Sequence, residues 1–319
     1  LRVAFYLTFI LCLFLGGGSR AKAETPEFRA LWITRFEWPS EDAEKCKENI
    51  LQIFTDMEKA NFNTAVFQVR GQCDTLYPST LEPWSPLFGS KDPGFDPLAF
   101  AIEEAHKRGI QFHAYLNPVP LFSWRREFTP PPHTTPEHPY YLHGPDSAEP
   151  WVCYDDKGNM MDPSKAEYWY LSPGIPDAMA HVRAVIKDLV TRYDIDGIHF
   201  DRIRYPGAVY SRDPISVKRF YGRGNPNRLE WFDWQREQLD KFTNDVYAEV
   251  MALKPHIIVS CAAWGIYNRQ NVPGYDKFSS GFHDYYQDTW NWVRLGSMDL
   301  LMPMIYWDMN DPKPNYQEL

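Results

Sequence analysis

Two residues suited to catalysis stand near the end of a short apolar run, 197–201. Side chains alternate between the two faces of a strand, so His199 and Asp201 share one face while Ile198 and Phe200 share the other. If the apolar pair packs under helices, His199 and Asp201 point inward. Asp201 comes last, where the strand meets solvent, and that is where a parallel α/β barrel keeps its chemistry.

Simpler roles compete with catalysis at both positions. Asp201 could be an ordinary strand-end acid that pairs with Arg202 or Arg204, and His199 could be an interior histidine that orients a carboxylate. An acid and a histidine on the inward face of an apolar strand both need partners. We therefore predict catalysis for Asp201 and leave His199 open between the two roles.

The elements that must position these residues alternate along the chain. Strands are expected at 28–34, 64–69, 110–116, 197–201, 257–263 and 300–306, and helices at 40–60, 97–107, 176–192, 229–253 and around Trp290. This order predicts a parallel sheet with right-handed crossovers. No glycine-rich phosphate loop follows the first strand and polar residues end every strand, so we expect a barrel rather than a dinucleotide-binding sheet. Asp194 and Asp196, at the opposite strand end, should be structural.

A long insertion separates the third strand from the next helix, at about 118–172. Such a length is unusual for a loop, so the insertion is either functional or a small subdomain. Residues 151–161 contain a predicted hairpin with a turn at 155–158. An insertion after a barrel strand lies over the catalytic face.

The first 23 residues are typical of a secretory signal peptide. They combine Arg2, an apolar run at 3–15 and small residues before a cleavage point after Ala23. We expect residues 24–319 to be exported to the periplasm or beyond the cell, with no membrane span after cleavage. An uncleaved anchor is the alternative, and Cys12 lacks the setting of a lipid-modified cysteine.

Charge and cysteine content limit the partners. The chain has 33 basic and 42 acidic residues, and cleavage removes three basic ones, leaving a net charge of −12 that argues against nucleic acid. Four cysteines remain, Cys46, Cys73, Cys153 and Cys261, without metal-type spacing. We expect free thiols, with Cys73 and Cys153 the one pair to test, and no metal or other cofactor. Aromatic residues make up 16% and cluster between the elements, which suggests an aromatic-lined cleft.

Six segments carry a family resemblance: RALWI at 29–33, FNTAVFQVR at 62–70, DPGFDPL at 92–98, EEAHKRG at 103–109, DGIHFD at 196–201 and PMIYWD at 303–308. Together they resemble the bacterial glycosyl-hydrolase-like 10 family. The resemblance implies a glycosidase-type (β/α)8 TIM barrel and similarity to enzymes that cut cell-wall glycan strands. The family's barrel has two further strands, so we expect this chain to be a barrel truncated after its sixth strand.

The resemblance also implies a site. Glycoside hydrolysis generally uses two carboxyl groups, one as acid and one as base or nucleophile. Asp201 is the first, and Asp308 is slightly ahead of Glu37 as the second. The residues expected to contact sugar, by hydrogen bonding or stacking, are Gln68, Arg70, Asn117, His199, Trp264 and Tyr306.

Three hypotheses follow. The leading one is an exported glycoside hydrolase acting on a bacterial glycan, plausibly peptidoglycan strands, and the second is a non-catalytic glycan-binding barrel. A weaker third is a metal-dependent deacetylase using His113, His199 and Asp201. Replacing Asp201 by Asn separates the first two, because it should abolish turnover while sparing binding in an enzyme.

Overall fold

The computed structural model describes residues 27–123, 131–162, 167–317 and 319. The predicted signal peptide lies outside the described residues. None of the helices in the described ranges is long and apolar enough to cross a bilayer. Among the described residues, the cysteines are all buried free thiols: Cys46, Cys73, Cys153 and Cys261.

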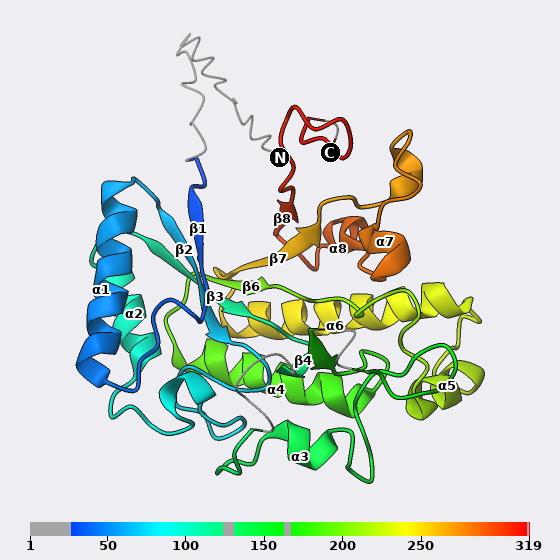
Figure 1. Cartoon of the computed structure of the whole chain (residues 1–319), viewed down its shortest axis with the longest axis horizontal. Coiled ribbons are helices and arrows are strands. Elements are labelled where there is room, and N and C mark those ends of the chain that lie inside the picture. The colour runs from blue at the N-terminus through cyan, green and yellow to red at the C-terminus, as the bar shows by residue number, and fades with distance from the viewer. Residues whose placement is uncertain (1–26, 124–130, 163–166, 318) are drawn as a thin grey trace, which may run out of the picture.

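Six parallel strands form the central sheet in the order in which they occur along the chain, as Figure 1 shows. They are β1 (Ala30–Ile33), β2 (Thr64–Arg70), β3 (Gln111–Leu116), β6 (Gly197–Phe200), β7 (Ile258–Trp264) and β8 (Leu300–Met304). The sheet curls, so that β1 and β8 both lie towards the top of Figure 1 with the other strands below them. The predicted barrel-type α/β fold is confirmed as a half-barrel. Within the described residues, β1 and β8 each pair with one strand only.

Helices cover the outer face of this sheet. The long ones are α1 (Ala43–Lys59), α2 (Pro97–His106), α4 (Pro176–Arg192) and α6 (Trp231–Leu253). The shorter elements are α5 (Pro214–Tyr221), α7 (Gly281–Asp284), α8 (Thr289–Leu295) and the 3-10 turns Pro86–Phe88 and Arg269–Asn271. Local sequence explains two of the starts, because Asp42 and Asp96 cap α1 and α2 by accepting backbone N–H groups of the first turn.

The two faces of the strands bury different side chains. Phe67, Phe112 and Phe200 belong to the main core between sheet and helices. The inward face carries a small apolar cluster of Val66, Tyr115 and Met302. His199 and Tyr115 are register partners on neighbouring strands, so both point into the half-barrel.

The insertion after β3 forms a small layer of its own. It contains β4 (Pro120–Ser123), α3 (Pro139–His143) and β5 (Tyr168–Tyr170), and β4 pairs antiparallel with β5. The predicted hairpin is present as an antiparallel bridge between Tyr154 and Met160. The β4–β5 pairing was not predicted. It places two tyrosines of β5 just beyond the carboxyl end of β3.

Candidate active site

Asp201 follows β6 directly and has both carboxylate oxygens held. The Tyr115 hydroxyl donates to Oδ2 at 2.9 Å, and the Arg202 backbone N–H donates to Oδ1 at 2.6 Å. Arg204 Nη1 lies 3.5 Å from Oδ1. Burial acts to raise the pKa of Asp201, but Arg204, Arg202 and these hydrogen bonds outweigh it, so the pKa lies below its ordinary value. Asp201 is therefore an anion at neutral pH, suited to act as base or nucleophile.

His199 is fully buried and both ring nitrogens have partners. Trp32 Nε1 donates to His199 Nε2 at 3.2 Å, and an indole N–H is only a donor, so the imidazole proton is on Nδ1. That nitrogen lies 3.0 Å from Ser260 Oγ, whose hydroxyl donates to the Ile198 carbonyl. Burial lowers the pKa of His199 to about 3. The neutral, fully paired ring favours the orienting role over proton transfer.

Arg70 is buried at the end of β2 and its donors are used within the protein. It forms two 2.7 Å hydrogen bonds to the buried carboxylate of Glu82 and also donates to the carbonyls of Asn117 and Pro118. His181 contacts the same carboxylate at 2.9 Å. This network links β2 to the chain after β3 and to α4. The Arg70 guanidinium is therefore held inside the protein by these partners.

Gln68 and Asn117 lie on the inward side near Asp201 and each is anchored by one amide atom. Gln68 Oε1 accepts from the Arg35 backbone N–H at 2.9 Å, and Asn117 Nδ2 donates to the Gly71 carbonyl at 3.0 Å. Gln68 Nε2 and Asn117 Oδ1 have no hydrogen-bond partner among the described residues. The two side chains thus have fixed orientations and unused polar atoms.

Aromatic rings border the acid on the β7 and β8 side. Trp264 packs on Tyr285 with ring centroids 4.1 Å apart, and Arg204 stands over Trp264 at 5.4 Å. Tyr306 lies beyond the end of β8 and is 84% exposed. Partial desolvation and then the Asp201 charge raise the pKa of Tyr306.

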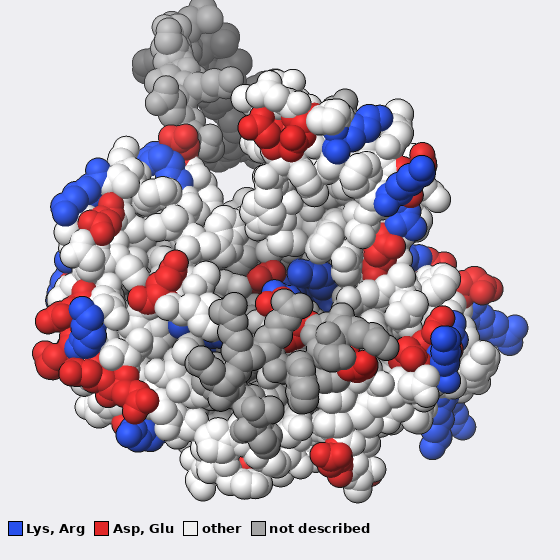
Figure 2. All heavy atoms as spheres, in the orientation of Figure 1, with Lys and Arg blue, Asp and Glu red and all other residues white. Residues whose placement is uncertain are grey.

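Arg35, Arg202, Tyr168 and Tyr170 complete the surroundings. The sequence indicated Arg202 only as a possible ion-pair partner of Asp201 and did not indicate the other three. Arg202 stands over Tyr168 at 4.8 Å and donates to Tyr170 Oη at 3.1 Å, while Arg35 donates to Tyr168 Oη at 3.1 Å. Figure 2 shows basic and acidic side chains side by side near the centre of this face, set back between the β1 and β8 sides. The only available signal was the alternation Tyr-Trp-Tyr at 168–170.

Comparison with known proteins identifies the family. A sequence profile of the glycosyl hydrolase-like 10 family matches residues 27–319. The chain belongs to this family. It is 30% identical over 298 residues to the glycosyl hydrolase YngK of Bacillus subtilis strain 168, covering 89% of this chain and 54% of that protein. It is 28% identical over 326 residues to the glycosyl hydrolase DigH of Escherichia coli K12, covering 95% of this chain and 71% of that protein.

Solved structures share the fold of this family member. The PgaB (BpsB) glycoside hydrolase domain of Bordetella bronchiseptica aligns with a TM-score of 0.61 at 16% identity, over 88% of this chain and 74% of that one. Alpha-L-fucosidase isoenzyme 2 of Paenibacillus thiaminolyticus aligns with a TM-score of 0.52 at 18% identity, over 78% and 34%. At these identities the likeness concerns the fold alone.

The two other predicted carboxylates are exposed and have local partners. Glu37 accepts from the Thr34 backbone N–H at 2.7 Å and lines a groove of about 320 Å³ between β1 and α1. Asp308 accepts from the backbone N–H of Asn310 at 2.8 Å, in a turn beyond β8. Within the described residues, no hydrogen bond or ion pair joins either one to Asp201. Glu167 is linked to Asp201 indirectly. Its carboxylate forms a 2.5 Å ion pair with Arg202, whose backbone N–H donates to Asp201.

A metal-dependent reading has little support in the geometry. Among the described residues, no three His, Cys, Asp or Glu side chains are grouped so that they could hold a metal ion. His113 pairs in register with Gly197, two residues before His199 on β6. Both ring nitrogens of His199 already have hydrogen-bond partners. The proposed triad of His113, His199 and Asp201 is therefore not assembled as a ligand set.

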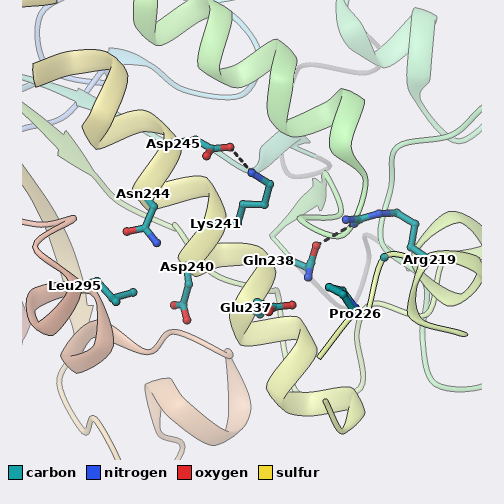
Figure 3. Close-up of a pocket in the computed structure, with 10 residues that line it drawn as sticks. Arg219, Pro226, Glu237, Gln238, Asp240, Lys241, Asn244, Asp245 and Leu295 are labelled. Carbon is teal, nitrogen blue, oxygen red and sulfur yellow. Dashed lines mark hydrogen bonds and ion pairs between the residues drawn. The ribbon is translucent and has the colours of Figure 1, made fainter. Parts of the chain in front are cut away.

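The pocket shown in Figure 3 lies on the helical side of the molecule and is distinct from the strand-end site. It has a volume of about 450 Å³ and is lined mainly by α6. Its polar side chains pair with one another, Lys241 with Asp245 at 2.8 Å and Arg219 with Gln238 at 2.9 Å. Because these groups satisfy each other, the pocket is a weaker candidate than the cluster around Asp201.

Proposed function

We propose that the chain is an exported glycoside hydrolase that cleaves glycan strands of the bacterial cell wall, with Asp201 as its anionic carboxylate. The observation that carries this proposal is the setting of Asp201, at the carboxyl end of a parallel strand with one oxygen held by Tyr115 and the other by the Arg202 backbone. Membership of the glycosyl hydrolase-like 10 family supports the reaction class. The cell-wall substrate and export rest on the family resemblance and the N-terminal sequence.

In this mechanism Asp201 either attacks the anomeric carbon or activates the water that does. An ionised carboxylate also stabilises the positive charge that develops on the sugar ring. A second group must protonate the leaving oxygen. We propose Asp308 or Glu37 for that role, and Glu167 joins them because it lies across Arg202 from Asp201.

The remaining polar and aromatic groups would hold the sugar. Trp264 and Tyr306 supply ring faces at the β7 and β8 side, and aromatic faces stack on the apolar faces of sugars. Gln68 and Asn117 supply amide atoms that have no described partner. His199 and Arg70 contribute by orienting their neighbours.

The decisive experiment compares the wild-type chain with Asp201→Asn on peptide-free cell-wall glycan strands. We expect sugar release to fall by at least 10³-fold, since the reaction loses its anionic group, while glycan affinity changes by less than tenfold. Asp194→Asn, at the opposite strand end, is the matched control and should keep full activity. Undiminished release by Asp201→Asn would overturn the assignment.

The second carboxylate is then identified by three single variants, Asp308→Asn, Glu37→Gln and Glu167→Gln. Loss of a general acid affects substrates with poor leaving groups most, so the correct variant should retain activity on an activated aryl glycoside while losing it on the natural strand. If all three variants keep wild-type activity on the natural strand, none of the three residues is the proton donor. Export is tested separately, by N-terminal sequencing of the protein recovered outside the cytoplasm.

A glycan-binding module is the second candidate function. It is favoured by the exposed positions of Glu37 and Asp308, each of which accepts a hydrogen bond from a backbone N–H of its own turn, since hydrolysis generally needs a second carboxyl group at the site. A binder would retain glycan affinity, show no turnover in the wild type and be little changed by Asp201→Asn.

A further inference from the structure

We propose that the strand-end site binds a carboxylate carried by the glycan, in a cradle of Arg35, Arg202 and Arg204. The inference rests on the proposed function and adds the substrate's chemical class to it. It follows from how these side chains are packed, from the balance of charge around them and from the donors they leave unused.

Arg202 and Arg204 both contact Asp201, and Arg35 is linked to Arg202 through Tyr168. Arg35 and Arg202 both contact Tyr168, the first by a hydrogen bond to its hydroxyl and the second over its ring. Arg204 lies 3.5 Å from the Asp201 carboxylate and stands over Trp264. Arginine stacks well on aromatic faces, so these rings hold the cations in place without neutralising them.

The charges in this cluster do not balance. Among the described residues, Asp201 and Glu167 are the carboxylates that form ion pairs with it, against three arginines. Arg35 is only 5% exposed and makes no ion pair with any described residue. A buried charge without a partner is costly, and here the excess is positive in a chain whose overall charge is −9. An anion that enters with the substrate would relieve that cost.

Unused donors point to the same ligand. Arg204 is 9% exposed, and its Nη1 forms an ion pair with Asp201 Oδ1 at 3.5 Å but makes no hydrogen bond to any described residue. A guanidinium presents parallel N–H donors that match the two oxygens of a carboxylate. Because the cradle adjoins Asp201, the bound carboxylate belongs to the sugar being cleaved or to its neighbour.

The test uses one glycan in two charge states. Peptide-free cell-wall strands carry free lactyl carboxylates, and carbodiimide coupling to methylamine converts these to neutral amides without altering the backbone. We expect the wild-type chain to bind the carboxylate form at least 30-fold more tightly by calorimetry. Arg35→Met and Arg204→Met should each lose most of that preference, while affinity for the amide form stays within threefold. Arg35→Lys keeps the positive charge but lacks the paired N–H donors of a guanidinium. It should recover part of the preference for the carboxylate form that Arg35→Met loses.

The outcomes separate this inference from the hydrolase proposal. Equal affinity for the two forms overturns the cradle, whether or not strands are cut. Preferential binding of the carboxylate form without turnover of either form overturns the hydrolase and leaves the cradle intact. Inhibition by inorganic sulfate with no effect of amidation would assign the arginines to a free anion and reject the glycan carboxylate. Thermal unfolding of each variant identifies any that is misfolded. If Arg35→Met or Arg204→Met is misfolded, the binding result of the other one tests the cradle.

Discussion

Replacing His113 by Leu should remove an acid sensitivity that is built into the half-barrel. His113 is fully buried on β3, and neither ring nitrogen has a hydrogen-bond partner among the described residues. Burial lowers the pKa of His113 to about 4, with Asp196 acting weakly in the opposite direction. The folded chain therefore holds this imidazole neutral where an unfolded chain, with an ordinary pKa near 6.5, would protonate it.

The sign and size of the effect follow from this difference. As the pH falls below about 6.5 the unfolded state takes up a proton first, so stability is fully present above pH 6.5 and declines towards pH 4. Between pH 7.5 and pH 5 one such histidine accounts for about 2 kcal/mol. Leu has nearly the same volume and does not titrate. We expect His113→Leu to be within about 1.5 kcal/mol of wild type at pH 7.5 and to gain about 2 kcal/mol relative to it at pH 5.

Urea unfolding followed by tryptophan fluorescence at pH 7.5, 6.5 and 5 measures this difference. His256→Gln, which alters an exposed histidine, is the control and should parallel the wild type. Parallel curves of unfolding free energy against pH for wild type and His113→Leu would refute the reasoning, because they would show that the folded chain protonates this ring as easily as the unfolded one.

Three further outcomes can be measured on the same protein. Glu82→Gln should cost about 3–5 kcal/mol in urea unfolding, since it leaves a buried arginine unpaired, and a cost under 1 kcal/mol would contradict this. Tyr115→Phe removes a hydrogen bond that lowers the pKa of Asp201, so the acidic limb of the pH–rate profile should move to higher pH; an unmoved limb would argue against the contact. Gly197→Ala would bring a Cβ within 2.5 Å of the neighbouring imidazole and should destabilise the chain by about 2 kcal/mol or more, whereas at Gly207 the nearest atom is 3.7 Å away and Ala should be tolerated.

The sequence alone determined the order of elements and the position of the acid. Strand and helix periodicity and capping residues act within a few positions of each other, so α4 was predicted with its observed bounds, Pro176–Arg192. Alternation along one strand was also enough to put His199 and Asp201 on the inward face. Both inferences need only local geometry, and both hold in the folded chain.

Only the tertiary structure decided which partners the inward residues have. Arg70, a predicted sugar contact, forms two hydrogen bonds to Glu82, a pairing that the sequence did not indicate. The tautomer of His199 is set by Trp32, a residue 167 positions away. Tyr168 reaches Arg35 and Arg202 because the insertion forms an antiparallel strand pair that the sequence pattern did not predict. These contacts depend on which strands become neighbours, and local sequence does not carry that information.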